Sequence, residues 1–191
     1  MDALPQYKFA EILSGIKRLT WGSSAEIFPY GKNILRLTTS DNSHNILEYC
    51  QNRGLAVPIV YQSFGGSTHD DLDCDGCEFC DETWFSDIYL NEIERLEVLE
   101  PDVSREMEAE IDRLLRMNPR SGEQIVSGEH IDQFLQNIEE YDFDFKLIDF
   151  NTLKFIANKC SDCSWGDIDI HHTNFMYSKI QNRIVFSDPV Y

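Results

Sequence analysis

Near the end of the sequence, carboxylate and amide side chains follow one another at spacings that could support a chemical reaction. Asp169 and Asn174 stand five residues apart, and a short strand is predicted at 174–177. After a polar turn, a second predicted strand at 183–186 leads to a further carboxylate, Asp188. Phosphoryl transfer needs such a set, because a hard cation must bridge nucleotide phosphates through oxygen ligands while another carboxylate orients the nucleophile. The competing interpretation is a polar loop followed by a surface hairpin.

The order and spacing of these groups are those of the catalytic loop and metal-binding strand turn of a protein-kinase-like fold. In that loop the aspartate, here Asp169, accepts the proton of the substrate hydroxyl, and the asparagine, here Asn174, helps to hold Mg²⁺. Asp188 stands at the strand end where such a fold carries its metal-binding aspartate. An Asp-x4-Asn pair alone has little value, so the prediction depends on the strand, turn, strand and carboxylate that follow it.

The same segment resembles the early serine/threonine protein kinases of autographivirus-type (T-odd) bacteriophages. The family pattern Asp-x-His-x-x-Asn-hydrophobic-Met-aromatic-Ser occurs here at 169–178, and the closing Asp-Pro-Val occurs at 188–190. More weakly, residues 22–28 look like the family's abbreviated glycine loop and residues 33–37 like its lysine-bearing third strand. The resemblance covers about residues 20–191, and its specific part is the last 25 or so.

The resemblance also implies a set of nucleotide contacts. The backbone of Gly22, Ser23 and Ser24 would contact ATP phosphates. Arg36 stands where the family has its ATP-anchoring lysine, and Glu48 lies on the helix that would pair with it, although a solvated helix glutamate is an alternative. Arginine can bind phosphate, but its planar fork is not a conservative replacement for a compact ammonium group.

The function implied by the resemblance is ATP- and Mg²⁺-dependent phosphoryl transfer to serine or threonine of bacterial host proteins, in the cytoplasm of an infected bacterium. Two departures favour another hypothesis: Arg36, and the end of the chain at Tyr191, three residues past Asp188, with no activation segment. Under that hypothesis the chain is a catalytically inactive, kinase-like acidic protein that binds and inhibits a host enzyme. A third hypothesis is a small-molecule kinase, which would better tolerate a short C-terminal lobe.

Periodicity predicts the elements that must position these groups. Apolar residues at helical spacing predict an amphipathic helix at 4–19 and three later helices, one capped by Asp102, one after Ser127 and one over 145–158. The remaining predicted elements are strands at 27–30, 33–39, 57–61 and 84–90 and a helix at 40–52. This order predicts an α+β protein with a minimal two-lobed protein-kinase-like fold, with a strand-rich N-lobe at 1–91 and a helical C-lobe with a terminal hairpin at 92–191.

The charge of the chain bears on its partners. Thirty-four acidic residues against 16 basic ones give a net charge of −18, so a nucleic-acid backbone would be repelled and direct nucleic-acid binding is not expected. A protein partner with a basic surface fits this charge, and the alternative is that acidity serves solubility. No apolar run reaches the length of a membrane span, so no membrane association is expected.

The six cysteines suggest a second, independent kind of site. Cys74, Cys77 and Cys80, with His69 before them and the Cys160/Cys163 pair elsewhere, could supply four ligands to zinc. The alternative is a flexible acidic loop with reduced thiols.

Two further motifs near Asp169 indicate alternatives to the kinase interpretation. His171 and His172 could indicate a metal site, but a histidine pair in a loop needs further ligands. Asp167-Ile-Asp169 is compatible with the Asp-x-Asp of nucleotide-sugar transferases, which would leave Asn174 and Asp188 unexplained.

Overall fold

The computed structural model describes seven stretches of the chain: residues 9–21, 25–67, 88–120, 123–126, 130–141, 144–163 and 166–190. They belong to two compact units, residues 1–44 with 60–95 and residues 45–59 with 96–191. Antiparallel strands and helices occur together, which confirms the predicted α+β class.

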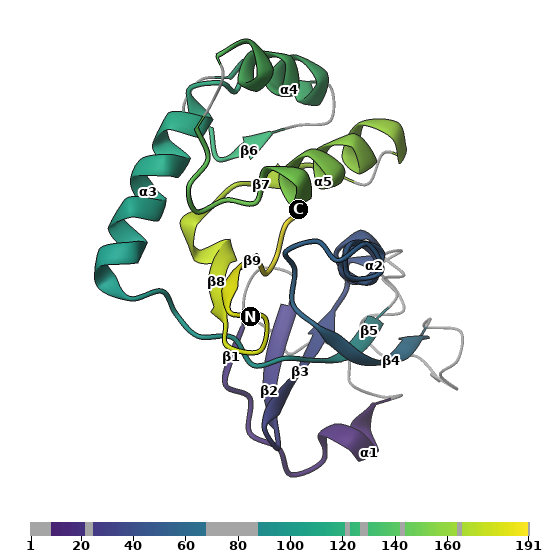
Figure 1. The fold of residues 1–191 in the computed structure, drawn as a ribbon. Helices are drawn as coiled ribbons and strands as arrows, with labels where there is room; N and C mark the ends of the chain where they lie inside the picture. The colour runs from purple at the N-terminus through teal and green to yellow at the C-terminus, as the bar shows by residue number, and fades with distance from the viewer. Residues whose placement is uncertain are drawn as a thin grey trace. The chain divides into compact units, whose positions relative to one another are not determined.

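The first unit is built on an antiparallel sheet of five strands in the order β1-β2-β3-β5-β4 (Figure 1). The bounds are Thr20–Trp21 for β1, Ala25–Tyr30 for β2, Asn33–Thr38 for β3, Val60–Ser67 for β4 and Ile88–Ile93 for β5. The predicted strand pair is confirmed as β2 and β3. Their turn passes through Gly31 at a φ of 57°, a conformation that glycine adopts without steric cost.

Both faces of β3 are buried. Leu35 and Leu37 are fully buried and pack in one apolar cluster with Phe9 and with Leu13 of the short helix α1 (Ala10–Leu13). Because side chains alternate along a strand, Arg36 lies on the opposite face, where it is 3 % exposed. The sheet therefore has an apolar face toward α1 and a polar residue inside its other face.

The N-terminal helix is shorter than the predicted span of 4–19. Among the described residues it ends at Leu13, and Gly15 follows with a φ of 73°. That left-handed conformation interrupts a helix and favours glycine. Leu19 then donates a backbone hydrogen bond to the carbonyl of Ile27 at 2.8 Å, so the predicted last helical turn belongs to the edge of the sheet instead.

The fourth and fifth strands begin later than predicted. The strand predicted at 57–61 occurs at Val60–Ser67. The strand predicted at 84–90 occurs at Ile88–Ile93, and residues 84–87 lie outside the described part. Val57 belongs to the second unit and is 2 % exposed, so its apolar character reflects packing there rather than strand pairing.

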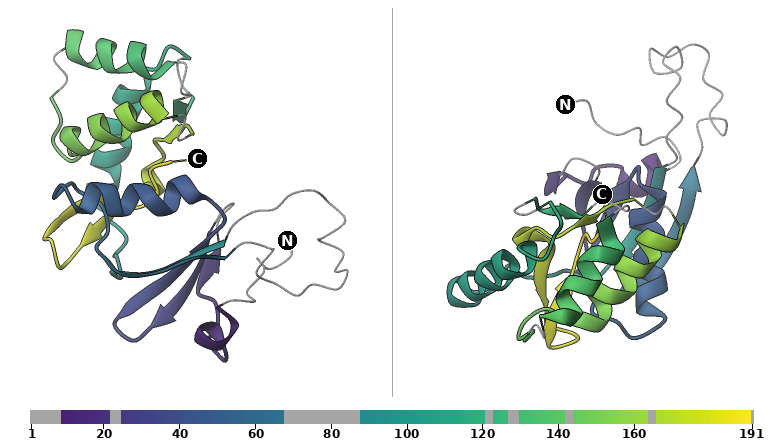
Figure 2. Two further views of the ribbon diagram at one scale, coloured as in Figure 1. Left: turned by 90° about the vertical axis from the view of Figure 1, so that its right-hand side faces the viewer. Right: turned by 90° about the horizontal axis from the view of Figure 1, so that it is seen from above.

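In the described part of the second unit, three α-helices follow β5, and α4 and α5 lie side by side (Figures 1 and 2). The helices are α3 (Pro101–Leu115), α4 (Ile131–Glu140) and α5 (Phe150–Cys163). Each buries one apolar stripe at helical spacing, with Met107, Ile111 and Leu114 in α3, Ile131, Phe134 and Ile138 in α4, and Leu153, Ile156 and Ala157 in α5. No helix in the described ranges is long and apolar enough to cross a membrane.

Two short strand pairs complete this unit. The bounds are Ile125–Val126 for β6, Ile168–Asp169 for β7, Phe175–Ser178 for β8 and Arg183–Phe186 for β9. β6 pairs with β7 and β8 pairs with β9, both antiparallel. The predicted terminal hairpin is therefore confirmed.

Two helix starts differ from the predictions. Helix α3 begins at Pro101, so Asp102 lies in its first turn and Glu100 takes the cap position. Proline suits the first helical position because it lacks the N–H that would have no helical partner there. Helix α5 begins at Phe150 rather than Phe145. Glu110 causes the delay, because its side chain binds the backbone just before α5.

The Glu110 carboxylate is 2 % exposed and accepts three consecutive backbone N–H groups. Its oxygens lie 3.1 Å from the nitrogen of Lys146, 3.2 Å from that of Leu147 and 2.9 Å from that of Ile148. Of the three amides, that of Ile148 is buried and would be left without an acceptor, whereas Lys146 is exposed and Leu147 half-buried. Glu110 thus fixes the segment that leads from α4 into α5.

Replacing Glu110 with alanine should lower the free energy of unfolding by about 1–3 kcal/mol, since the buried N–H of Ile148 loses its acceptor and an orphaned buried donor costs about that much. Glu110→Gln keeps one acceptor oxygen and should cost less. Urea denaturation followed by circular dichroism measures both. The control is Glu106→Ala on the exposed side of the same helix, with an expected change within about 0.5 kcal/mol. Equal stability of the two alanine variants would show that the Glu110 contacts contribute nothing.

Candidate functional site

Asp169 ends the two-residue strand β7, and one edge of that strand is held by β6. Ile125 of β6 lies directly opposite Asp169 in the antiparallel register. Next along the chain, the amide of Ile170 donates to the carbonyl of Gln124 at 2.9 Å. The backbone on either side of the Asp169 carboxylate is therefore tied to the segment that follows α3.

The other edge of β7 is held by the residues that follow the hairpin. The amide of Asp169 donates to the carbonyl of Pro189 at 3.1 Å, and Ile168 forms an isolated antiparallel bridge with Val190. Ile168 and Val190 are both buried, which fixes this pairing in the core. Asp169 is thus held between two backbone segments that are distant in sequence.

Asn174 lies at the end of a short 3-10 turn, η3 (His172–Asn174), that folds back on β7. Its amide nitrogen Nδ2 donates to the backbone carbonyl of Asp169 at 3.1 Å, and its backbone N–H donates to the carbonyl of His171 at 2.9 Å. The side chain of His171 caps the turn by accepting from the N–H of Thr173 at 3.3 Å. The five-residue spacing that the sequence predicts as functional therefore closes a small loop, with the amide beside the carboxylate.

Asp188 is brought to the same place by its two chain neighbours. Before it, Ser187 donates twice to the carbonyl of Asn174, from its backbone nitrogen at 2.7 Å and from its Oγ at 3.0 Å. After it, Pro189 accepts from the amide of Asp169. Because the residues on both sides of Asp188 are bonded to the other two candidates, the structure brings the predicted proton acceptor, Asp169, near the two predicted metal ligands, Asn174 and Asp188, within one unit.

The environment of Asp169 changes its acidity. Burial raises the pKa of its half-buried carboxyl group above the usual value. A hydrogen bond from the Asn174 side chain and the charge of His171 lower this pKa, while the negative charge of Asp188 raises it, and the net direction is upward. A raised pKa favours proton acceptance, because catalytic bases work best when their pKa approaches the working pH.

The donor set fits Mg²⁺ in its chemistry. Asp169 and Asp188 supply hard carboxylate oxygens. The nitrogen of the Asn174 amide is already engaged, so the oxygen of that amide is the atom left to face a cation. Proteins hold Mg²⁺ through one or two carboxylates plus substrate phosphates rather than through an all-protein cage. A cation here would also relieve the repulsion between the two carboxylates.

The two histidines beside this loop have other contacts. The ring nitrogen Nδ1 of His171 lies 2.6 Å from Oγ1 of Thr173, and the His171 and His172 rings are 4.3 Å apart. Nε2 of His172 lies 3.9 Å from Oε1 of Glu108 on α3. Among the residues that the structure describes, no three His, Cys, Asp or Glu side chains gather as metal ligands would.

Arg36 of the first unit is held inside that unit. Its Nη2 donates to Oγ of Ser43 at the start of α2 (Asp41–Gln51), and its neighbour across the sheet is Asn91 of β5. Glu48 lies farther along α2, is half-buried and belongs to the second unit. The expected contact of Arg36 with nucleotide phosphate and its pairing with Glu48 stay predictions.

Several predicted site residues cannot be placed. Gly22, Ser23 and Ser24 lie outside the described residues, and so do His69, Cys74, Cys77 and Cys80. Of the remaining cysteines, Cys50 and Cys160 are buried. Burial raises the pKa of Cys50 to about 12, so this thiol is protonated and a poor nucleophile at neutral pH.

Sequence reasoning missed three residues that assemble the site. Ser187 and Pro189 supply the bonds on either side of Asp188, and Gln124 accepts from Ile170 beside Asp169. A serine and a proline flanking a strand-end aspartate offered a local signal for the first two. Nothing near Gln124 in the sequence indicates its pairing, because the partner lies more than forty residues away.

A scan against models of protein families found no match to this chain, and a search of curated proteins found no matching relative.

Proposed function

We propose that the second unit carries a magnesium-dependent phosphoryl-transfer site formed by Asp169, Asn174 and Asp188. The observation that supports this most is the position of Asp188 between Ser187, bonded to Asn174, and Pro189, bonded to Asp169. Three oxygen-bearing side chains of the kind that a phosphoryl-transfer site requires thus come from two chain segments whose backbones are hydrogen-bonded to each other.

In the proposed reaction, a serine or threonine hydroxyl of the substrate gives its proton to the Asp169 carboxylate as its oxygen bonds to the γ-phosphorus of ATP. The bond from the γ-phosphorus to the bridging oxygen breaks, and ADP leaves with that electron pair. Asn174 and Asp188 would hold Mg²⁺, which when bound neutralises charge on the nucleotide phosphates. The hydrogen bond from the Asn174 side chain to the Asp169 carbonyl would fix the position of this proposed metal ligand relative to the proposed proton acceptor, Asp169.

We further propose that the fold is protein-kinase-like and that the substrates are proteins of a bacterial host. Support for the fold comes from the order of elements: an antiparallel sheet with one long helix after β3, then helices, then the β8–β9 hairpin with the candidate residues at its ends. Support for the host comes from the phage-kinase pattern at 169–178 and 188–190.

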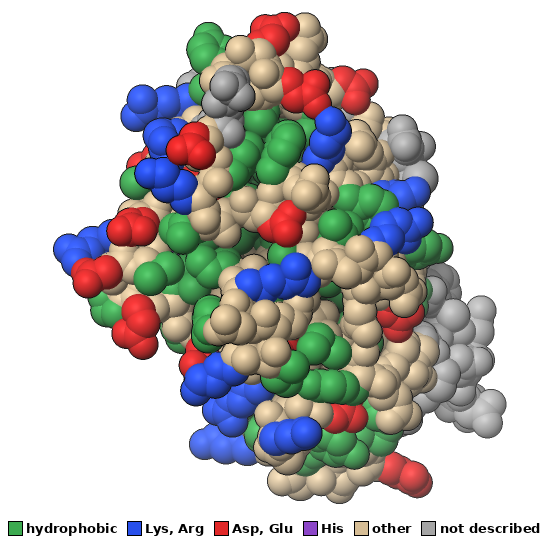
Figure 3. Space-filling view, viewed as in Figure 1, with side chains coloured by type: hydrophobic (Ala, Val, Ile, Leu, Met, Phe, Trp, Pro, Cys, Tyr) green, Lys and Arg blue, Asp and Glu red, His purple; other side chains and the backbone are tan. Residues whose placement is uncertain are grey.

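One observation favours the second candidate function, an inactive kinase-like protein that binds a host enzyme. Arg36 replaces the expected lysine, is 3 % exposed and is bonded to Ser43, so its guanidinium is engaged inside the first unit. The excess of acidic residues would then serve binding to a basic partner. On the face drawn in Figure 3, however, acidic side chains are interspersed with Lys and Arg rather than gathered into one patch.

Magnesium-dependent binding of ATP separates the two candidates. The melting temperature should rise when Mg²⁺ and ATP are added together and should not rise when EDTA accompanies ATP. A ligand at about 100 times its dissociation constant adds about 2.7 kcal/mol of stability, which a thermal shift detects readily. Radiolabelled ATP with a bacterial lysate should then label host proteins. No shift at millimolar nucleotide, together with no labelling, would reject the enzyme and favour the binding protein.

A further inference from the structure

We propose that Asn118, a residue outside the candidate site, is a positioning residue that holds the strand carrying Asp169. Asn118 follows α3 and is 3 % exposed. The functional part of this inference rests on the proposed phosphoryl-transfer activity, and its structural part does not.

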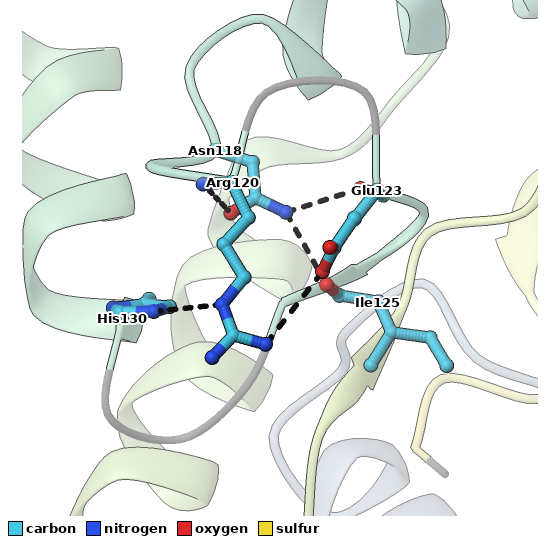
Figure 4. A network of polar contacts seen from close by, with 5 residues as sticks. All are labelled: Asn118, Arg120, Glu123, Ile125 and His130. Atoms are coloured by element: carbon cyan, nitrogen blue, oxygen red, sulfur yellow. Dashed lines mark hydrogen bonds and ion pairs between the residues drawn. The ribbon is translucent and has the colours of Figure 1, made fainter.

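The Asn118 side chain closes the turn between α3 and β6 (Figure 4). Its Nδ2 donates to the carbonyl of Glu123 at 3.0 Å and to that of Ile125 at 3.2 Å. Its Oδ1 accepts from the backbone N–H of Arg120 at 3.1 Å. Both amide hydrogens and the carbonyl oxygen are therefore used, and all three partners are backbone groups of one turn.

The residues of this turn are hydrogen-bonded to the strand that carries Asp169. Ile125, whose carbonyl Asn118 holds, lies opposite Asp169 in the β6–β7 register. Gln124, in the same turn, accepts from the amide of Ile170 at 2.9 Å. One buried amide therefore fixes the segment that forms an entire edge of β7. A two-residue strand has no further pairs in β6 with which to keep its place.

The contacts also require an amide. An aspartate at this position would lack both donors and would place carboxylate oxygens against the Glu123 and Ile125 carbonyls. Alanine would leave two carbonyls and one N–H of the turn without their partner, at a cost of about 1–3 kcal/mol for each buried group that stays unsatisfied. Loss of the turn should move Asp169, and misplacement of a catalytic group by about 1 Å can cost on the order of 10²-fold in rate.

A purely structural role is the competing explanation, and Asn137 provides a matched control. Its Nδ2 donates to the carbonyl of Met117, just after α3, at 2.8 Å, and its Oδ1 accepts from Nε2 of Gln133 on its own helix at 2.9 Å, so neither bond is to β6 or β7. Asn137→Ala removes the same chemical group from the same region. Both variants should lose stability, and only Asn118→Ala should affect the surroundings of Asp169.

The test compares Asn118→Ala, Asn118→Ser and Asn137→Ala with wild type by amide hydrogen exchange and by kinetics. In the Asn118 variants the Ile170 amide should exchange at least about tenfold faster than global destabilisation explains, and the rate of transfer should fall on the order of 10–10²-fold with KM for ATP little changed. Asn137→Ala should show neither effect. Should Asn118→Ala not fold, the serine variant carries the comparison.

The positioning role would be overturned if the Ile170 amide exchanges faster only in proportion to the loss of global stability, and does so equally in the Asn118 and Asn137 variants. If wild type transfers no phosphoryl group, the proposed activity fails while the exchange comparison still decides whether Asn118 holds β7. If wild type is active and the Asn118 variants exchange faster at Ile170 but keep their turnover, the residue holds the strand without serving catalysis, and the functional part of the inference is rejected.

Discussion

Replacing Asp169 with asparagine should lower the rate of phosphoryl transfer on the order of 10²–10⁴-fold, the usual contribution of a positioned proton acceptor. Asparagine keeps the shape of the side chain, and its carbonyl oxygen can still accept from Asn174, but it cannot take the hydroxyl proton. In wild type the rate should rise with pH as the carboxyl ionises through its raised pKa. Label incorporation from ATP measures both effects, and equal labelling by the two proteins would remove the catalytic role of Asp169.

The same variant should be no less stable than wild type at neutral pH. Because the pKa of Asp169 is raised in the folded state, its ionisation is disfavoured by folding. The stability that its protonated form contributes is fully present below the unfolded pKa and is lost as pH rises through the folded pKa. Asp169→Asn removes this loss. The melting temperature of the variant minus that of wild type should therefore be larger at pH 7 than at pH 4. A variant that is relatively less stable at pH 7 would contradict the assigned environment.

Replacing Asp188 with asparagine should lower the transfer rate on the order of 10²–10³-fold, comparable to removing one preorganised electrostatic contact from an active site. It should also raise the Mg²⁺ concentration that the reaction needs, because the one carboxylate among the two proposed metal ligands, Asn174 and Asp188, is lost. A titration of rate against Mg²⁺ concentration measures this effect. An unchanged titration curve would show that Asp188 does not bind the metal.

Asp188→Asn has a second expected effect that requires no catalysis. The charge of Asp188 raises the pKa of Asp169, so removing that charge should lower the pKa of Asp169. Carbon-13 NMR of the carboxyl groups follows this titration directly. The control is Asp112→Asn, which makes the same charge change at an exposed position of α3 and should leave the Asp169 titration unchanged. If Asp188→Asn also leaves it unchanged, the two carboxylates do not interact.

The local features of the site could be predicted from the sequence. The β8–β9 hairpin follows from two short apolar segments around a polar turn, and the loop from Asp169 to Asn174 spans only five residues. The buried apolar residues of α3 and α4 could be predicted equally well, because a helix repeats its buried positions every three or four residues. These predictions needed no knowledge of distant contacts.

The features that sequence reasoning missed depend on distant residues. Helix α5 starts at Phe150 instead of Phe145, because Glu110 on another helix captures the amides of the preceding segment. The pairing of β7 with Gln124 on one edge and Pro189 on the other likewise joins segments that are far apart in sequence. The spacing of apolar residues, every two in a strand or every 3.6 in a helix, shows which face of the element is buried. It does not identify the segment that packs against that face.

Arg36 has a position that the sequence could predict and a role that stays a prediction. Its place in β3 follows from alternation with Leu35 and Leu37, and the family resemblance implies a phosphate contact for it. In the structure, Ser43 accepts a hydrogen bond from Arg36 inside the first unit. A buried guanidinium needs such hydrogen bonds in any case, so this contact would form whether or not the chain binds a nucleotide.

We expect the side chains of Asn174 and Asp188 to bind one divalent cation beside the carboxylate of Asp169. Paramagnetic broadening by substoichiometric Mn²⁺, recorded on the isotope-labelled protein, tests this expectation most directly. The amide signals of these three residues and of Ser187 should broaden first, excess Mg²⁺ should reverse the effect, and Asp188→Asn should abolish it. Broadening confined to other acidic segments, with these signals unchanged, would contradict the account.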